Sequence, residues 1–525
     1  MTDQGPIEMK PNILFIMADQ LRADYLSCAG HPSVKTPTLD RLAAEGVRFE
    51  RAFCNAPVCG PSRMSFYTGR YPASHGATYN NVPLRVDELT LGDYLRPLGY
   101  RVGLVGKTHM RADIEGMRRL GVDPESSRGV YARECGFEPF ERDDGLHPDG
   151  AVDSDLPYNR YLRQHGFGGD NPWHEWANSA LDDNGERVSG WYLRNAHLPA
   201  RVPEPHSETA YMTDRAMDFI RETGDAPWCL HLSYIKPHWP YMAPAPYHAM
   251  YGAADVSPPN RSVAERGNAH PVVRAFRQHE ESVNFSRDEV RARVIPTYMG
   301  LISQLDHHLG RLFDFLREQG QYENTLIVFT SDHGDFLGDH WLGEKEVMYE
   351  EALRIPMIAR LPGGVRGRIF EQMVESVDLV PTFLELAGGD RHDHVLEGRS
   401  LLPLLKGARP PWRDAVFAEM DYAWRPARAE LDAAADGARA WMVRTERWKY
   451  IEYQGFAPQL YDLESDPVEQ HDLGTAAAYE AVRRMLADRL HDWLRTRRMR
   501  KTISNETVSA LTGSARRRGY IFGAW

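Results

Sequence analysis

Short apolar runs alternate with amphipathic stretches over roughly the first 400 residues of the chain. Four runs are rich in branched or aromatic side chains, as buried strands are: ILFIMA (13–18), VGLV (102–105), CLHLSY (229–234) and LIVFT (326–330). Between the runs, stretches such as TLDRLAAE and TYMGLISQLDHHLGRLFDFLRE repeat apolar residues with helical spacing. Strands that alternate with helices predict an α/β fold with a large, mostly parallel sheet.

The pattern changes in two places. Residues 111–205 are rich in Gly, Asp, Pro and Trp and weakly periodic, which predicts loops inserted over the sheet. Further along, strand-like runs at 440–453 and 459–472 precede a helical stretch at 479–495, which predicts a smaller α+β domain. The chain therefore divides into a large α/β domain, a smaller C-terminal α+β domain and a tail: 1–408, 409–495 and 496–525.

The predicted tail carries two clusters of basic residues and three aromatic side chains, Tyr520, Phe522 and Trp525. A disordered tail and an arm that packs on a second copy of the chain both fit this composition. The arm would make the protein a homo-oligomer, either a dimer or a tetramer.

Composition narrows the class of protein. The chain has 525 residues, of which 42% are hydrophobic and 26% charged, as in a globular enzyme. A net charge of −12 argues against a nucleic-acid partner, and an anionic substrate would need a local positive cluster. The N-terminal segment lacks a secretory pattern, and its apolar run 13–18 is too short to span a membrane. We therefore expect a cytoplasmic protein without a membrane partner.

Polar residues that suit metal or anion chemistry follow each of the four predicted strands. Because ligands in open α/β sheets bind beyond the carboxyl ends of the strands, we expect these side chains to meet at one edge. In chain order they are Asp19 and Gln20, Lys107 and His109, Lys236 and His238, and Asp332 and His333.

Two carboxylates and an imidazole among them predict a metal site. An Asp after a strand is often only a loop cap. Asp19 together with the Asp332-His333 pair, however, forms a donor set for one divalent cation. Gln20 either adds an amide oxygen to this site or holds the loop, and the sequence leaves both roles open.

The lysines and the other histidines predict an anion site. A single lysine is usually a solvated charge, and a lone histidine after a strand is usually structural. Two Lys-x-His spacings at separate strand ends, Lys107 with His109 and Lys236 with His238, favour a shared role, to which Lys345 is a further candidate. Such cations stabilise negative charge on a tetrahedral anion, and a histidine can protonate a leaving group.

Cys59 precedes a predicted helix, Ser62–Thr68, whose N-terminus favours anions. An inert buried thiol and a metal-free cysteine hydrolase are alternatives. An oxygen nucleophile suits a hard cation better than sulfur does. The five cysteines form no CxxC pair, and their odd number gives no disulfide framework.

Taken in their order along the chain, these motifs resemble those of type I sulfatases of the alkaline phosphatase superfamily, in the branch of arylsulfatases and phosphonate monoester hydrolases. Cys59-Gly60-Pro61-Ser62-Arg63 has the form Cys-x-Pro-Ser-Arg, by which sulfatases have a cysteine oxidised to formylglycine. The resemblance runs from about Pro11 to Leu473 and includes PNILFIMADQ, KTPTLDRLAAEGVRF, CGPSRMSFYTGRYP, GKTH, IKPHWPY, FTSDHGDFLGDHWLGEK and LYDLESDP.

The resemblance implies an alkaline-phosphatase-like fold, in which helices sandwich the sheet, and a mechanism. A formylglycine-generating enzyme would convert Cys59 into an aldehyde, whose hydrate attacks a small anionic ester substrate. Asp19, Asp332 and His333 would bind one divalent ion together with a formylglycine oxygen.

The remaining site residues are also carried over by resemblance. Arg63, Lys107 and His109 would orient the hydrate and help the covalent ester to break down. His238 and Lys345 would contact the transferred group and assist the leaving oxygen. Asn80 and Lys236 would bind the substrate, and the match of Lys236 to the family is the less specific of the two.

Two departures from the family pattern shape the expectation. Gln20 stands where many sulfatases have Asp and His333 where many have Asn, so Mn²⁺ joins Ca²⁺ as a candidate ion. Phosphonate monoester hydrolases replace the second-strand Lys and His by uncharged residues, whereas this chain keeps Lys107 and His109. The segment 242–259 and the basic tail, by contrast, resemble those of phosphonate monoester hydrolases.

We therefore expect a hydrolase of sulfate monoesters with cross-reactivity toward phosphonate monoesters and phosphodiesters. One alternative is an enzyme that is primarily a phosphonate monoester hydrolase or phosphodiesterase with the same machinery. Another is a catalytically inert binding protein of the same fold.

Overall fold

The computed structural model describes residues 10–80, 82–149, 155–521, 523 and 525. Residues 1–9 and Phe522, on which part of the N-terminal and tail predictions depends, lie outside the described residues.

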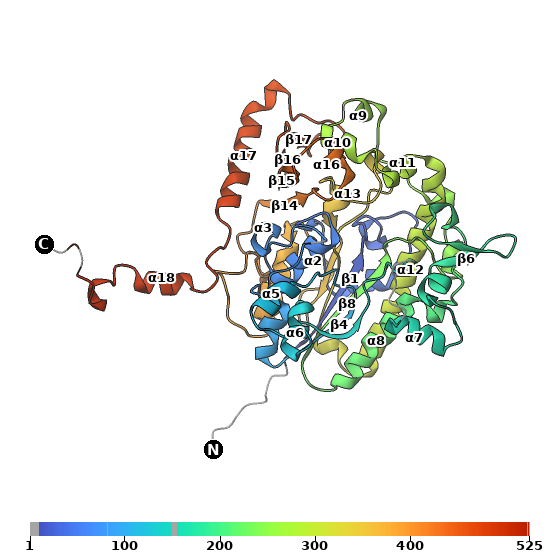
Figure 1. Ribbon diagram of the computed structural model, residues 1–525, viewed down its shortest axis with the longest axis horizontal. Coiled ribbons are helices and arrows are strands. Elements are labelled where there is room, and N and C mark those ends of the chain that lie inside the picture. The colour runs from blue at the N-terminus through green and yellow to red at the C-terminus, as the bar shows by residue number, and fades with distance from the viewer. Residues whose placement is uncertain (1–9, 81, 150–154, 522, 524) are drawn as a thin grey trace, which may run out of the picture.

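A mixed eight-stranded sheet forms the centre of the large domain (Figure 1). Its strands lie in the order β12 (Arg368–Phe370), β2 (Val47–Phe49), β11 (Met357–Arg360), β9 (Thr325–Ser331), β1 (Asn12–Asp19), β8 (Trp228–Pro237), β4 (Arg101–Gly106) and β5 (Glu138–Arg142). The five strands from β9 to β5 pair in parallel, whereas β11 runs antiparallel to both of its neighbours. The predicted α/β class is confirmed.

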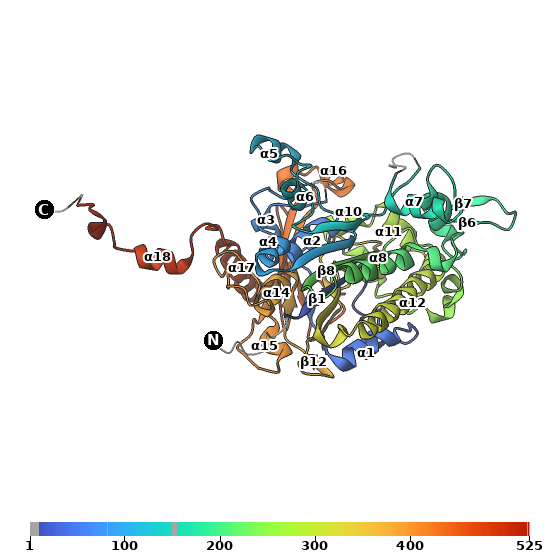
Figure 2. The ribbon, with the colours of Figure 1, turned by 90° about the horizontal axis from the view of Figure 1, so that it is seen from below.

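Helices cover both faces of the sheet, as Figure 2 shows. Alternate residues of β1 enter different cores: Phe15 packs with Phe66 and Phe383 on one side, and Ile16 packs with residues of the long helices on the other. The first face is covered by α2 (Cys59–Thr68), α4 (Leu91–Leu95) and α14 (Leu379–Leu386). The second face is covered by α1 (Pro37–Glu45), α8 (Glu208–Thr223) and α12 (Asp288–Glu318).

The segment 111–205, predicted as loops, contains short elements that carry too few residues to show periodicity. One of them, β5, extends the central sheet, so the prediction of loops alone is wrong there. Among the described residues of this segment, the other α-helices and strands are α5 (Ile114–Arg119), α6 (Ser127–Arg133), α7 (Pro157–Gln164), β6 (Ser179–Leu181) and β7 (Arg187–Ser189).

The small C-terminal domain contains a four-stranded antiparallel sheet and two α-helices, the shorter of which is α16 (Pro426–Glu430). The predicted single run at 440–453 is a hairpin of two strands, and Lys449 on the second strand is buried between Glu350 (2.9 Å) and Glu469 (2.7 Å). This ionic contact ties the small sheet to the chain that follows β9. The four strands are β14 (Ala415–Asp421), β15 (Arg439–Thr445), β16 (Trp448–Tyr453) and β17 (Gln459–Asp462), and the longer helix is α17 (Glu480–Arg495).

The tail leaves the body after α17 and projects from it, carrying α18 (Asn505–Leu511) (Figure 1). Its first part is attached to the large domain, because Lys501 pairs with Asp87 at 2.8 Å and Glu88 at 2.9 Å. Self-association through this arm stays a prediction. None of the described helices is both long and apolar enough to cross a bilayer.

Candidate active site

The carboxyl ends of β1, β4, β8 and β9 meet the N-terminus of α2 at one edge of the sheet. The side chains gathered there are buried rather than solvated. Eight of them are at most 1% exposed: Asp19, Gln20, Cys59, Arg63, Lys107, His238, Asp332 and His333. The strand-end pattern in the sequence therefore corresponds to one buried site.

Four residues offer a compact set of metal-ligand atoms. Asp19, Cys59, Asp332 and His333 each contribute one such atom, and these atoms lie within 4.8 Å of one another. The Cys59 Sγ atom is 3.1 Å from His333 Nε2 and 3.8 Å from Asp19 Oδ1. The His333 Nδ1 atom is 2.8 Å from the carbonyl oxygen of Gly334, so donation there leaves Nε2 directed at the set.

The electrostatics of this set fit a divalent cation. Burial raises the pKa of Asp332, and the neighbouring Asp19 carboxylate adds to the rise despite the pairing with Arg63. Burial alone would also raise the pKa of the Cys59 thiol, but Lys345, Lys107 and His333 hold it well below its ordinary value. Two buried carboxylates beside a group that favours its anionic form are stabilised by a bound cation.

Arg63 joins three of the strand ends to α2. Its Nε donates to Asp332 Oδ2 at 2.8 Å, and its Nη1 donates to the Lys107 carbonyl oxygen at 2.8 Å and to Ser233 Oγ at 2.7 Å. The guanidinium has no exposed surface, so its charge is balanced by the buried carboxylates.

Lys107 and His109 approach the cysteine from the β4 side. Lys107 Nζ donates to Asp19 Oδ2, and His109 contributes to the lowered pKa of the Cys59 thiol, although its buried Nδ1 atom has no hydrogen-bond partner among the described residues. His109 has a left-handed backbone, with φ at 51°. The backbone nitrogens of Thr108 and His109 both donate to Asp144 Oδ1, at 2.9 and 3.0 Å, which fixes this turn.

His238 and Lys345 form a hydrogen-bonded pair on the other side. Lys345 Nζ lies 3.2 Å from His238 Nε2, and His238 Nδ1 is 2.7 Å from the Trp239 carbonyl oxygen. Burial lowers the pKa of His238 to about 3, and Lys345 and Lys107 contribute to the decrease. His238 is therefore neutral near pH 7, with Nε2 as the acceptor, while Lys345 carries the charge.

Gln20 lies behind this pair. Its side-chain oxygen accepts from Lys345 Nζ at 2.7 Å, its side-chain nitrogen donates to Asp335 Oδ2 at 2.6 Å, and its backbone nitrogen donates to Asp332 Oδ1 at 3.0 Å. Both ends of the amide are thus used to hold Lys345 and the loop after β9. These contacts favour the loop-holding role of Gln20 over that of a metal ligand.

The two predicted substrate-binding residues lie differently. Asn80 Oδ1 accepts from the backbone nitrogen of Gly60 at 2.7 Å and so caps the first turn of α2 beside Cys59. Lys236 Nζ instead contacts Asn178 Oδ1 at 3.3 Å and the Pro240 carbonyl oxygen at 2.8 Å. Asn80 therefore lies next to the cysteine, whereas the hydrogen bonds of Lys236 are made to Asn178 and Pro240.

The cysteine itself begins α2, three residues before the predicted helix start at Ser62. Val58, at the N-cap, provides no side-chain hydrogen bond. In the first turn the N–H of Gly60 is taken by Asn80 and that of Ser62 by the Val58 carbonyl oxygen, so it is the dipole of α2 that favours negative charge at the position of Cys59.

Comparison with known families agrees with this geometry. The family model described as Sulfatase matches residues 11–389, and the model described as N-sulphoglucosamine sulphohydrolase, C-terminal, matches residues 338–496. The first match covers more than half of the chain. The protein belongs to the sulfatase family. The predicted membership is confirmed, and with it the class of hydrolases.

Relatives of this sulfatase-family protein include both predicted branches. It is 33% identical to the multifunctional alkaline phosphatase superfamily protein PehA of Trinickia caryophylli, over 92% of this chain and 95% of the relative. The arylsulfatase of Clostridium perfringens is 28% identical, over 90% and 92%. The structure of the phosphonate monoester hydrolase of Silicibacter pomeroyi aligns with a TM-score of 0.81 at 30% identity, over 95% and 98%.

Two contributors to the sulfatase-family site were missed in the sequence. Asp144 follows β5, so the strand-end argument would have found it had EPFER been recognised as a strand. Asp335 lies three residues after Asp332, and it accepts from Gln20 and, at 2.7 Å, from Tyr241 Oη.

His340 forms a second buried ionic cluster on the segment between His333 and Lys345. Its Nδ1 is 2.8 Å from Glu265 Oε1, its Nε2 is 3.4 Å from Glu351 Oε2, and its ring stacks on Tyr349 at 3.9 Å between centroids. Burial acts to lower the pKa of His340, but the two glutamates raise it to about 10.

We expect His340→Gln to lower the free energy of unfolding by about 3 kcal/mol near pH 6, because Glu351 loses the imidazolium that it shares with Glu265, and only Glu265 keeps an ion pair among the residues that the structure describes, with Arg277. The folded-state pKa is raised from an ordinary 6.5, so the stabilisation is complete below pH 6.5 and is lost as the pH rises through about 10. Urea unfolding of both proteins at pH 6, 8 and 10 measures the difference. A difference that stays constant or grows toward pH 10 would contradict the charged state of His340.

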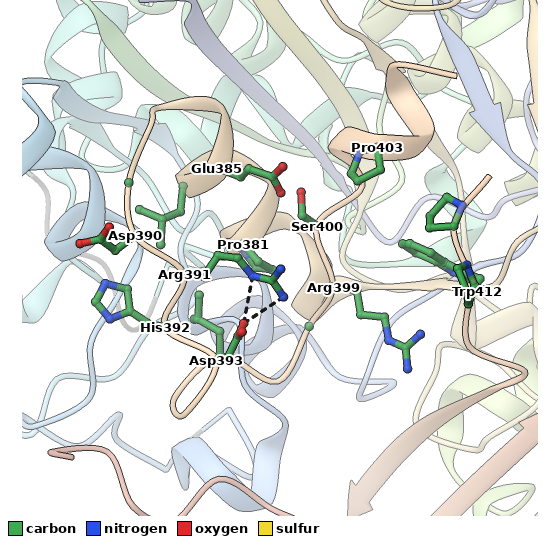
Figure 3. A pocket seen from close by; sticks show the side chains of 16 residues that line it. Pro381, Glu385, Asp390, Arg391, His392, Asp393, Arg399, Ser400, Pro403 and Trp412 are labelled. Carbon is green, nitrogen blue, oxygen red and sulfur yellow. Dashed lines mark hydrogen bonds and ion pairs between the residues drawn. The ribbon is translucent and has the colours of Figure 1, made fainter. Parts of the chain in front are cut away.

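A pocket of about 430 Å³ lies apart from this site, between the end of α14 and Trp412 (Figure 3). Arg391 and Asp393 pair with each other at its rim. None of the predicted site residues lines it.

Proposed function

We propose that this sulfatase-family protein is a formylglycine- and metal-dependent hydrolase of sulfate monoesters, with aryl sulfates as test substrates. The observation that carries the proposal is the set of ligand atoms from Asp19, Cys59, Asp332 and His333 within 4.8 Å. It is supported by the Lys345–His238 pair and by Lys107, which provide positive charge beside the cysteine.

The two groups acquired after synthesis have distinct roles in this proposal. Formylglycine at residue 59 would supply, as its hydrate, an oxygen nucleophile and a second hydroxyl that allows the product anion to be expelled. A divalent ion, Ca²⁺ or Mn²⁺, would be held by Asp19, Asp332, His333 and residue 59. It would supply Lewis acidity and lower the pKa of the hydroxyl that acts as the nucleophile.

The side chains of the chain would orient the reactants and move protons. Lys107 and Arg63 neutralise Asp19 and Asp332 and keep these carboxylates in place. His109, after the end of β4, would take the proton from the hydroxyl that remains after attack. Lys345, held cationic beside neutral His238, would carry the proton that the departing oxygen needs.

Peptide mass spectrometry of residue 59, with metal analysis of the same sample, tests the proposal. We expect the aldehyde or its hydrate in place of cysteine, and about one divalent ion per chain. Activity should fall on chelation and return with Mn²⁺ or Ca²⁺, whichever the metal analysis finds. An intact thiol in a fully active sample that chelators do not affect would instead support a metal-free cysteine hydrolase.

A second candidate function is primary hydrolysis of phosphonate monoesters or phosphodiesters by the same machinery. It is favoured by the likeness to the phosphonate monoester hydrolase of Silicibacter pomeroyi. The contact of Lys107 with Asp19, and the presence of His109 at the end of the same strand, favour sulfate in our proposal. One leaving group presented on sulfate and on phosphonate distinguishes the two, because the larger kcat/KM identifies the primary activity.

Replacing both Lys107 by Gln and His109 by Asn is expected to lower kcat/KM for the sulfate ester roughly 100-fold and that for the phosphonate roughly 10-fold. The reason is that both residues provide charge and proton transfer at the nucleophile, which phosphonate monoester hydrolases manage without. The readout is the ratio of the two constants, with thermal unfolding to verify the fold. Equal losses on both esters would contradict this account of specificity.

The partners follow as proposals from the same reading. We propose that a formylglycine-generating enzyme modifies the nascent chain, and that the tail over 496–525 joins copies into a dimer or tetramer. Sedimentation of the full chain against one that ends at residue 503 measures the oligomeric state.

A protein that binds aryl sulfates but turns none over would favour the alternative of a catalytically inert binding protein.

A further inference from the structure

A pocket of about 560 Å³ lies at Trp191, which is connected to His238 of the active site through the ring of Trp239. Its walls are the segment from Trp191 to Arg194 on one side and, on the other, α11 (Glu280–Phe285) and the start of α12. A volume of this order holds a ligand with more than one ring.

Aromatic contacts connect the pocket to the residue that faces the leaving oxygen. The rings of His238 and Trp239 lie 4.6 Å apart between centroids, and those of Trp239 and Trp191 lie 5.4 Å apart. Trp191 lines the pocket. The indole rings of Trp239 and Trp191 therefore form a continuous aromatic contact between His238 and the pocket.

The opposite wall is attached to the loop that carries Lys345. Arg425 pairs with Glu281 of α11 and, at 2.7 Å, with Glu346. The pocket is thus bounded by elements that are joined to both members of the Lys345–His238 pair.

The lining offers hydrogen-bond donors that the protein does not use. The indole nitrogens of Trp191 and Trp239 are buried without a hydrogen-bond partner in the described part of the chain. Arg293 donates to the Arg194 carbonyl oxygen at 3.1 Å, and the Arg194 guanidinium lies 4.5 Å over the Tyr192 ring. Neither arginine forms an ion pair within the described residues.

The charge of the pocket contrasts with that of the whole chain. Of the remaining charged side chains that line it, Arg287 pairs with Glu289 at 3.4 Å, so Arg194 and Arg293 leave an excess of positive charge over Glu280. This excess occurs in a chain with a net charge of −12. Arg293 also lines an adjoining pocket of about 320 Å³, where it lies with Glu289, so the excess of positive charge is confined to the first pocket.

We propose that this pocket binds the leaving group of the ester and selects a ring-bearing group that carries a second negative charge. The ring packs against Trp191, and the anionic substituent meets Arg194 and Arg293. The inference rests on the proposed ester hydrolysis and names the substrate class within it.

The probes are the sulfate esters of 4′-hydroxybiphenyl-4-carboxylate and of its methyl ester, which place a charged or a neutral group two rings from the reacting bond. In Arg194→Gln/Arg293→Gln, the ratio of kcat/KM for the carboxylate over the methyl ester is expected to fall on the order of 10-fold, chiefly through KM. Because the ratio is compared between proteins, differences in intrinsic reactivity of the two esters cancel. The preference of the unmodified protein should also weaken as salt is added.

Matched variants separate local from general effects. Arg366→Gln/Arg484→Gln removes two exposed arginines outside the pocket, changes the net charge equally and is expected to leave the ratio in place. Arg293→Lys keeps the charge and should retain most of the preference. An unchanged ratio in the Arg194→Gln/Arg293→Gln protein, or an equal change in the control, overturns the inference.

Binding of free 4′-hydroxybiphenyl-4-carboxylate distinguishes this failure from that of the proposed function. Calorimetry on the intact protein is expected to show binding that weakens in the double variant. Arginine-dependent binding without hydrolysis of either ester would contradict the proposed function and support the leaving-group pocket. Hydrolysis together with binding that does not depend on the arginines would support the proposed function and contradict the leaving-group pocket.

Discussion

Cys59→Ala is expected to lower kcat/KM for aryl sulfates by at least about 10⁴-fold, because it removes the atom from which the nucleophile is made. Asp19, Asp332, His333 and the cations around them remain in the variant, but they have no reacting oxygen to orient. The loss should appear almost entirely in kcat, since the groups that contact the substrate are retained. Initial rates with one aryl sulfate over a range of concentrations provide the measurement.

Cys28→Ala is the matched control, because Cys28 is another free cysteine but is half-buried and outside the site. It should keep the activity of the unmodified chain. Comparable loss in both variants would point to a general effect of cysteine removal. Substantial activity in Cys59→Ala would refute the proposed nucleophile.

Asp332→Asn is expected to lower both bound metal and kcat/KM, the latter by about 10³-fold. The amide can still accept from the Gln20 and His333 backbone nitrogens, both at 3.0 Å, so the local fold has partners. It lacks the charge that a divalent ion and Arg63 require, however. Metal content per chain and the rate with added Mn²⁺ or Ca²⁺ measure the effect.

Asp306→Asn provides the corresponding control. Asp306 is also buried and accepts from the backbone nitrogens of Thr38 and Leu39, at 3.0 and 2.8 Å, where it caps α1. Burial raises its pKa to about 6. We expect this variant to be less stable but to bind metal as before. If metal content falls in Asp306→Asn but not in Asp332→Asn, the metal site proposed here is wrong.

The central strands could be predicted because they are buried on both faces. Residues 13–18 and 326–330 are continuous apolar runs for this reason, and the polar residue that follows each run marks the site. The strand β5 escaped prediction because it lies at the edge of the sheet, where EPFER is only partly buried and mixes charged with apolar residues. Asp144 was missed together with it.

Contacts that join distant parts of the chain have no signature in local spacing. Gln20 could have been a ligand or a loop support on sequence alone, and only its bonds to Lys345 and Asp335, more than 300 residues away, separate the two. His340 and Glu265 likewise come together across 75 residues. The leaving-group pocket depends on Trp191 and Arg194, which lie in the weakly periodic segment.

The position of Cys59 makes activation depend on two rates, that of oxidation of the cysteine and that of folding of the segment around it. The side chain is 1% exposed and begins a helix, so a second protein cannot reach it once α2 has packed. The proposed oxidation must therefore finish while the segment is still extended. A chain that folds first is locked in the thiol form, and slower folding should increase the share of active molecules without altering the final structure.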